Sequence, residues 1–355
     1  MTAIESHAER SATERGRDAA PRIKVAFVDR EPRSGFLSTD LACLERDFDV
    51  ERIVYPGRNS ISWIVTSLRA ASRCHVLYVF FASEHALAPV LAFRLLRRRV
   101  VLVQGGYDYA DVPERAYGLA ARGHGWLPRL IGRLCSVSLA ISTQSRDEFV
   151  ALVPCAADRT RVSYLAVDAE TWNDPGVERR ADRIVTFGYI DDEAYSRKGI
   201  DRFVAAAVAD PTHEYVLAGR LTPSVAARVD AARSDVPHLV VTGHLDHDAL
   251  ARLLWSAGVY AQLSWHETFG VAMAEAMLCG CVPVIGNSPA LAEVGGSWAV
   301  HAGDASSVAD DVAAIAAATE SGRHIDRADL RADTAGRFAV EQRAAALRDA
   351  IEGER

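Results

Sequence analysis

Short apolar runs alternate with segments of helical spacing along most of this chain. In the first half, six runs rich in β-branched and aromatic residues are predicted strands: Ile23–Val28, Val50–Val54, His75–Phe80, Val100–Gln104, Val137–Ser142 and Arg161–Leu165. The amphipathic segments between them are predicted helices: Leu37–Arg46, Ser60–Ala71, Ala86–Arg98 and Arg129–Cys135. Runs such as VLYVFF are apolar at every position, which suits strands covered on both faces. The alternation predicts a doubly wound parallel sheet.

A polar stretch with Pro175 and Gly176 interrupts the alternation, and a second series follows. Its predicted strands are Ile184–Phe187, Tyr215–Ala218, Leu239–Val241, Val259–Leu263, Val282–Ile285 and Trp298–Val300. Its predicted helices are Ile200–Val208, Ser224–Arg233, Asp246–Ser256, Gly270–Leu278, Val308–Ala318 and, at the end of the chain, Phe338–Ile351. We expect an α/β protein whose two Rossmann-like domains face each other. The predicted divisions are a disordered tail (1–20), a first domain (21–168), a linker (169–181), a second domain (182–335) and a C-terminal helix (336–355).

Composition and charge narrow the class of protein. The chain has 355 residues, 49% hydrophobic and 25% charged, which is typical of a folded protein large enough for two domains. Its net charge of −7 is divided unevenly, since residues 21–165 carry +6 and residues 166–355 carry −12. The acidic balance disfavours a nucleic-acid partner, whereas the basic first half would tolerate an anionic surface.

Neither a metal site nor an export signal is evident in the sequence. The six cysteines include no CxxC pair, so we expect them to be ordinary core residues. The polar first 20 residues lack the apolar core of a signal peptide, and no window is apolar enough for a membrane span. These observations predict a cytoplasmic protein.

The stretch from Ser264 to Gly296 holds the most informative chemistry. A predicted strand ends there, a short loop carries Glu267, and a helix begins at Gly270. Ligands of open α/β sheets bind at the carboxyl ends of strands, and the free N–H groups of a helix start favour an anion. Glu275 follows Glu267 by eight residues, which is about 80° around a helix. Both carboxylates can therefore face one cleft, where they would accept hydrogen bonds from sugar and ribose hydroxyls. Glutamates at this spacing near a helix start also occur simply because they stabilise the helix.

This stretch resembles glycosyltransferase family 4, the group 1 retaining transferases. Their pattern combines two glutamates separated by seven residues with conserved small and apolar neighbours, matched here by Ser264, Glu267, Thr268, Phe269, Gly270, Glu275, Ala276, Met277, Gly280, Pro283 and Val284. The resemblance implies the GT-B fold, with the C-terminal helix packing back towards the first domain. It also implies that Glu267 binds the donor sugar and Glu275 the nucleotide ribose. His266, Thr268 and the backbone of Phe269, Gly270 and Val271 would complete the donor site.

Two further segments of the second domain resemble the same family. Lys198–Gly199 fits the K-G element that binds the donor diphosphate, with Arg197 beside it, although Tyr189 stands where the family has arginine. Gly243, His244 and Leu245 lie in the element that borders the nucleobase pocket. His244 and His247 are three residues apart, but no third metal ligand is evident, so we expect a loop and a helix cap there.

The first domain resembles the family more loosely. Gly35 follows the first predicted strand, as the family's glycine loop does, and is assigned to donor binding. Gly105–Asp108 is similar to the family's H-G-x-D element, but the histidine position is Gly105. If the family's histidine has a role near the reacting centre, another residue of this chain would have to take that role, for example His124. Asp108 is assigned a catalytic role facing the acceptor, together with Glu267 and Lys198; a plain turn residue is the alternative.

The resemblance implies a retaining hexosyltransferase that uses a nucleotide diphosphate sugar, without metal or other cofactor. The acceptor would be a hydroxyl of a glycan, a lipid-linked compound or a small molecule. The alternatives are a nucleotide-sugar epimerase or a non-catalytic nucleotide-sugar-binding protein of the same fold. Arginine clusters in Leu91–Arg99 and Trp126–Arg133 follow apolar positions. Peripheral contact with the inner face of the cell membrane and a solvated helix surface are both compatible with these clusters.

Overall fold

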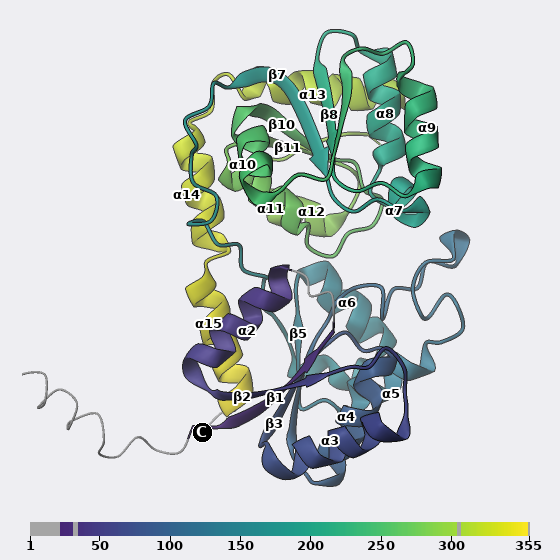
Figure 1. The fold of residues 1–355 in the computed structure, drawn as a ribbon, viewed down its shortest axis with the longest axis vertical. Helices are drawn as coiled ribbons and strands as arrows, with labels where there is room; N and C mark the ends of the chain where they lie inside the picture. The colour runs from purple at the N-terminus through teal and green to yellow at the C-terminus, as the bar shows by residue number, and fades with distance from the viewer. Residues whose placement is uncertain (1–21, 31–34, 304–306, 354–355) are drawn as a thin grey trace, which may run out of the picture.

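The computed structural model describes residues 22–30, 35–303 and 307–353, which form two domains, one above the other in Figure 1. Each domain contains a six-stranded parallel sheet flanked by helices. The predicted architecture of two facing Rossmann-like domains is therefore confirmed. The predicted disordered tail, residues 1–20, lies outside the described residues.

The N-terminal domain has the strand order β2-β1-β3-β4-β5-β6. Its strands are β1 (Lys24–Asp29), β2 (Asp49–Val54), β3 (Val76–Phe80), β4 (Arg99–Val103), β5 (Val137–Ala140) and β6 (Thr160–Val162). Its helices are α2 (Gly35–Asp47), α3 (Ile61–Arg73), α4 (Glu84–Leu95), α5 (Trp126–Leu134) and α6 (Thr143–Leu152), with short 3-10 helices at Pro113–Arg115 and Pro154–Arg159. The strand order reverses between β1 and β3, which is where ligands bind in open sheets of this kind.

The C-terminal domain has the strand order β12-β11-β10-β7-β8-β9. Its strands are β7 (Arg180–Phe187), β8 (Glu214–Ala218), β9 (Leu239–Gly243), β10 (Ala257–Gln262), β11 (Val282–Ile285) and β12 (Val300–His301). Its helices are α7 (Asp192–Arg197), α8 (Ile200–Ala209), α9 (Pro223–Arg233), α10 (His247–Ser256), α11 (Val271–Leu278), α12 (Pro289–Gly295) and α13 (Val308–Ser321). Among the described helices of both domains, none is long and apolar enough to cross a membrane.

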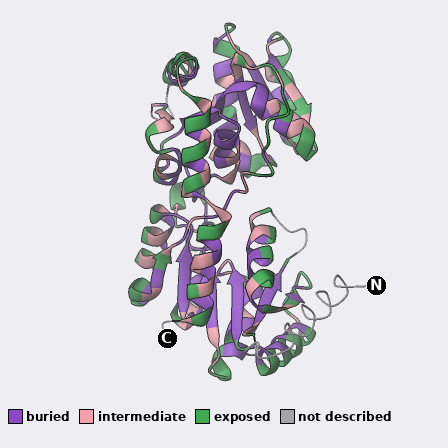
Figure 2. Ribbon diagram, turned by 90° about the vertical axis from the view of Figure 1, so that its left-hand side faces the viewer, coloured by how far each residue is buried: buried purple, intermediate pink, exposed green. Residues whose placement is uncertain are grey.

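The apolar runs of the sequence become the buried centre of each domain. Every residue of β3, β5, β10 and β11 is buried, and Figure 2 shows the strands buried between helices whose outer faces are exposed. A strand covered on both faces needs apolar side chains on both, which is why these runs do not alternate.

Several elements differ from the sequence prediction. Four helices were not predicted: α6, α7, α12 and, just before the C-terminal helix, α14 (Arg327–Arg337). Three of them are polar and begin at capping side chains, since Ser142, Asp191 and Asp326 each accept a hydrogen bond from a backbone N–H of the first turn. The predicted strand Trp298–Val300 was wrong at its start. Residues 296–298 form a 3-10 turn instead, and the Trp298 indole donates to Asp333 of α14 at 3.0 Å.

The last two helices connect the domains. Figure 1 shows α14 beside the C-terminal domain and α15 (Val340–Glu352) against α2 of the N-terminal domain. Arg343 of α15 is fully buried, and its guanidinium donates to both carboxylate oxygens of Asp40 in α2, at 2.8 and 2.6 Å. A buried charge pair is costly to break, so this contact holds α15 in place.

The two domains also contact each other directly. Glu293 of α12 accepts hydrogen bonds from the backbone N–H and the hydroxyl of Thr143, both at 2.8 Å, and from the Tyr164 hydroxyl at 2.8 Å. The Thr143 N–H belongs to the first turn of α6, where a carboxylate is favourable. Next to it, the Ala290 N–H donates to Gln144 at 2.9 Å. These bonds hold the two domains together beside the cavity between them.

Candidate active site

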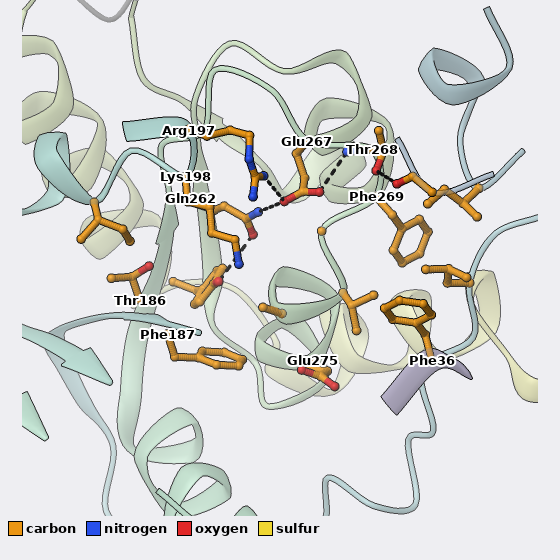
Figure 3. A pocket seen from close by; sticks show the side chains of 18 of the residues that line it. Phe36, Thr186, Phe187, Arg197, Lys198, Gln262, Glu267, Thr268, Phe269 and Glu275 are labelled. Carbon is orange, nitrogen blue, oxygen red and sulfur yellow. Dashed lines mark hydrogen bonds and ion pairs between the residues drawn. The ribbon is translucent and has the colours of Figure 1, made fainter. Parts of the chain in front are cut away.

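A cavity of about 410 Å³ lies between the two domains. Side chains of the N-terminal domain that line it are Phe36, Phe80, Phe81, Ile141 and Leu165, together with the backbone at Gly105. The C-terminal domain contributes the charged residues of the lining, which are Arg197, Lys198, Glu267 and Glu275. The predicted pair of glutamates and the predicted lysine are thus brought to one site (Figure 3).

Glu267 is held in one orientation by its neighbours. The Gln262 side-chain amide donates to one of its oxygens at 3.1 Å, and the Thr268 N–H donates to the other at 2.9 Å. An Arg197 guanidinium nitrogen lies 3.9 Å from the first oxygen. Thr268 itself donates to the Gly105 carbonyl of the opposite domain at 3.0 Å. Sequence reasoning missed Gln262, although an amide at the end of an otherwise apolar strand could have identified it.

Arg197 and Lys198 form the cationic side of the cavity. Arg197 is engaged by Glu193, at 2.5 Å in an ion pair one helical turn away. Among the hydrogen bonds and ion pairs of the described residues, none involves the Lys198 ammonium. Burial lowers the pKa of Lys198, and the Glu267 carboxylate opposes this effect. Lys198 is therefore the cation that remains available to an anionic ligand.

Glu275 lies apart from Glu267, at the lower part of the cavity in Figure 3. Desolvation by burial raises the pKa of this carboxyl from its usual value to about 7. Carboxylates whose pKa is raised in this way gain from ligands that donate hydrogen bonds to them. The diol of a ribose is such a ligand.

The start of α11 offers unpaired backbone donors to the cavity. Gly270 occupies the cap position with φ of 90°, a conformation that favours glycine, and has no side chain to cap the helix. Val271 and Ala272, the first helical residues, line the cavity with Gly270. Free N–H groups of a first turn attract anions, as predicted for this position.

A second cavity, of about 550 Å³, adjoins the first through their shared lining residue Phe187. His244, Leu245, Tyr189 and Arg220 also line it, while Gly243 ends strand β9 beside it. Arg220 was missed by sequence reasoning, although it lies only two residues after the end of strand β8. Tyr189, which replaces the family's arginine, is 58% exposed at the rim.

His247 lies against the segment that joins the two domains. It is the first residue of α10, its Nε2 lies 2.8 Å from the Thr171 carbonyl, and the helix cap is the Asp246 side chain. Within the parts of the chain that the structure describes, no three His, Cys, Asp or Glu side chains are grouped to hold a metal ion.

Four residues predicted for the site lie elsewhere. Asp108 is buried and accepts hydrogen bonds from the N–H groups of Ala82, Gly105 and Gly106, at 2.6, 3.3 and 2.8 Å. It fixes the loop after β4 and is not among the residues that line the cavity, and its catalytic role stays a prediction. His266 also misses the cavity, because its ring packs on Tyr117 and its Nε2 lies 3.3 Å from Glu148.

The other two are Gly35 and His124. Gly35 is the exposed first residue of α2, and its neighbour Phe36 reaches the cavity instead. Ser34 lies outside the described residues. His124, suggested as a substitute for the missing histidine, lines a different cavity of the N-terminal domain and cannot take that role.

Gly105 stands where the resembling family has a histidine, and the space around it explains why no side chain is present. A Cβ added to Gly105 would overlap the ring of Phe81, which fills the space where a side chain would project. Phe81 itself adopts a positive φ of 70°, which is uncommon for an aromatic residue and costly to maintain. An aromatic ring therefore occupies this wall of the cavity in place of a polar side chain.

Gly105→Ala is expected to destabilise the protein by about 1–3 kcal/mol, because the added methyl group overpacks against Phe81. Phe81→Ala should relieve much of that loss when both changes are combined, which a double-mutant cycle of chemical denaturation measures. Gly336→Ala is the matched control, since nothing lies within 4 Å of a Cβ at that position of α14. Equal effects of Gly105→Ala with and without Phe81 would contradict the steric account.

Comparison with known proteins agrees with this geometry. Residues 181–319 match a family described as "Glycosyl transferases group 1". The GDP-mannose:cellobiosyl-diphosphopolyprenol alpha-mannosyltransferase of Xanthomonas campestris is 26% identical over 284 residues, 77% of this chain and 71% of that protein. The GDP-mannose-dependent alpha-(1-6)-phosphatidylinositol dimannoside mannosyltransferase of Mycobacterium tuberculosis is 32% identical over 112 residues, 31% of this chain and 29% of that protein.

Solved structures share the fold. Anabaena HepE in complex with UDP and glucose has a TM-score of 0.72 at 16% identity, over 93% of this chain and 99% of that one. A putative UDP-N-acetylglucosamine 2-epimerase from Listeria monocytogenes has a TM-score of 0.62 at 12% identity, over 93% and 96%. At such identities the likeness concerns the fold alone.

Two facing parallel-sheet domains with a charged cavity between them define the GT-B class of glycosyltransferase folds. Within this fold, residues 181–319 carry the match to the group 1 glycosyltransferases, and the two mannosyltransferase relatives agree with that match.

Proposed function

We propose that the protein transfers mannose from GDP-mannose, with retention at the anomeric carbon, to a hydroxyl group of a lipid-linked acceptor at the cytoplasmic face of the membrane. The observation that carries this proposal is the meeting of Lys198, Glu267 and Glu275 in one cavity. Both sequence relatives are named as GDP-mannose-dependent enzymes, and both of their named acceptors carry a lipid, which supports the choice of donor and acceptor.

Each part of the donor has a complementary region. The nucleobase fits the cavity bordered by Tyr189, His244 and Leu245, and the ribose diol would then reach Glu275 through the shared wall at Phe187. Continuing along the donor, the diphosphate would meet the Lys198 ammonium and the free N–H groups at the start of α11. The sugar hydroxyls would donate to Glu267.

The chemistry requires stabilisation of the leaving group. As the bond between the anomeric carbon and the diphosphate breaks, negative charge grows on the phosphate oxygen, and Lys198 and the α11 amides stabilise it without a metal. The carboxylates among the cavity's lining residues are Glu267, which is already hydrogen-bonded, and Glu275. We assign binding roles to both. The departing phosphate oxygen would then accept the proton of the acceptor hydroxyl on the same face, which yields retention.

A non-catalytic nucleotide-sugar-binding protein is the second candidate. Two positions favour it, because Tyr189 and Gly105 replace the arginine and the histidine expected from the sequence resemblance. An epimerase needs an acid and a base at the sugar, whereas we assign the cavity's two carboxylates to binding and Lys198 to the leaving phosphate.

Incubation with radiolabelled GDP-mannose and a polyprenyl diphosphate-linked oligosaccharide separates these functions. We expect GDP release together with a labelled lipid product whose new bond has the anomeric configuration of the donor. Binding of GDP-mannose without GDP release would favour the non-catalytic protein. Product formation from UDP-glucose but not from GDP-mannose would refute the assigned donor.

A further inference from the structure

One face of helix α3 exposes an apolar stripe. The residues concerned lie three or four positions apart, and their exposed fractions are 81% for Ile61, 51% for Ile64, 38% for Val65 and 39% for Leu68. The core side of the same helix is already occupied by Trp63, which is 1% exposed. An amphipathic helix normally shows polar residues on the side away from the core. This helix is apolar on two sides.

The neighbouring helix α4 and the residue that caps its C-terminus continue the apolar surface. Leu91, Leu95 and Leu96 are 46%, 73% and 44% exposed. The two helices lie side by side, because the Trp63 indole donates to the His85 carbonyl at 3.3 Å and Asn59 donates to the Glu84 carbonyl at 3.2 Å (Figure 1). We call the seven exposed residues the α3–α4 face: Ile61, Ile64, Val65, Leu68, Leu91, Leu95 and Leu96. Single exposed apolar residues are ordinary, but seven on two adjacent helices indicate an interaction surface.

The charge around the α3–α4 face has one sign. Residues 58–98 include six arginines, which are Arg58, Arg69, Arg73, Arg94, Arg97 and Arg98, but a single carboxylate, Glu84. Among the ion pairs of the residues that the structure describes, the one that involves these arginines joins Arg73 to Glu51 of β2. The rest of the chain more than offsets this charge, since the whole protein carries −7. A two-fold dimer through this face would bring the arginines of one copy against those of the other, so a second copy is a poorer electrostatic match than an anionic lipid surface.

A third cavity, of about 590 Å³, lies at the N-terminal ends of the same two helices. Asn59, just before α3, and Glu84 and Leu87 of α4 line it, together with Trp126, which is 56% exposed. The polar head of a lipid-anchored molecule could therefore enter this third cavity while its apolar part contacts the exposed sides of α3 and α4. The predicted lipid contact through Trp126–Arg133 is otherwise not favoured, because Leu127 and Ile131 of α5 are buried.

We infer that the α3–α4 face binds the surface of an anionic lipid bilayer. Its apolar side chains enter the boundary between headgroups and acyl chains, and the flanking arginines contact lipid phosphates. This inference rests on the proposed function. When the N-terminal domain is bound to the membrane surface, it is placed where a lipid-linked acceptor is located.

Co-sedimentation with vesicles tests the inference. The full-length protein should bind vesicles of phosphatidylcholine and phosphatidylglycerol at physiological salt, and bind vesicles of phosphatidylcholine alone much more weakly. The double variant Ile64→Glu, Leu68→Glu should lower the partition coefficient by about tenfold or more, because two apolar anchors are lost and two like charges are introduced. The matched control is Val208→Glu, Val240→Glu, which alters two exposed valines of the C-terminal domain and should bind like the parent.

Two measurements keep failure of this inference separate from failure of the proposed function. Stabilisation by GDP-mannose in a thermal-shift assay should be the same in the parent and in both double variants, because none of these residues lines the donor cavities. Equal vesicle binding by Ile64→Glu, Leu68→Glu and the parent would overturn the inference even if GDP-mannose is bound. Sedimentation velocity that shows a dimer lost in this variant, without vesicle binding by the parent, would assign the face to a second copy and also overturn it.

Discussion

Lys198→Met is expected to lower the rate of donor cleavage by about 10²–10³-fold, mainly in kcat. The reason is that Lys198 is the cavity's unengaged cation, and a charge aimed at the leaving diphosphate matters most when negative charge develops there. Methionine retains an unbranched apolar stem, so the change removes the ammonium with little loss of packing. The measurement is GDP release from GDP-mannose at saturating donor.

The chain offers a matched control for this change. Lys24 is its only other lysine, and lies on β1 with its ammonium 3.5 Å from Asp49 at the protein surface. Lys24→Met should leave kcat unchanged. If Lys198→Met retains the parent's kcat while its thermal unfolding shows an intact fold, the assignment of Lys198 to the leaving group is refuted.

The donor side of the cavity could be predicted from the sequence because it is local. Glu267, Gly270 and Glu275 lie on one strand–loop–helix unit, and their mutual placement follows from the end of β10 and the start of α11. Lys198 was predictable for a similar reason, since it lies in the short turn between α7 and α8, two residues before α8 begins. In each case a few consecutive residues determine where the side chain points.

The surroundings of Asp108 and Gly105 depend on contacts between distant segments and could not be predicted. The direction of the Asp108 carboxylate is set by the Ala82 N–H, which belongs to the loop after the neighbouring strand. The missing side chain at Gly105 is explained by Phe81, from that same loop. A motif specifies the residue types of a segment but not what the adjacent loop places against it, so both positions required the structure.

Glu293 shows the same limit. In its own segment, Glu293 is a polar residue of the short helix α12, and nothing nearby in the sequence indicates its partners. In the structure, its carboxylate binds Thr143 and Tyr164 of the other domain, 150 and 129 residues away. The same holds for α6, whose polar sequence has little helical periodicity and whose start is fixed by the Ser142 cap and the Glu293 carboxylate.

Glu275→Gln is expected to stabilise the donor-free protein at pH 8 while weakening donor binding. The pKa of Glu275 in the folded protein is raised from 4.5 to about 7 by desolvation. A carboxyl with a raised pKa binds its proton more tightly in the folded than in the unfolded state. Stability is therefore gained at low pH and lost as the pH rises from about 4.5 to 7. At pH 8 the loss amounts to about 1–3 kcal/mol, which the neutral glutamine avoids.

The same change should have the opposite effect on the ligand. A ribose diol donates hydrogen bonds to a carboxylate, and hydrogen bonds to a charged group are worth about 1.5–3 kcal/mol, so GDP affinity at pH 8 should fall by about 10- to 100-fold. In the parent, affinity should increase as the pH rises through about 7, whereas in Glu275→Gln this part of the pH dependence should disappear. Calorimetric titration with GDP and thermal unfolding at pH 5 and pH 8 measure both effects, with Glu341→Gln, an exposed glutamate of α15, as the matched control. Unchanged GDP affinity in a folded Glu275→Gln protein would refute the assigned contact between Glu275 and the ribose. It would also refute the orientation assigned to the donor.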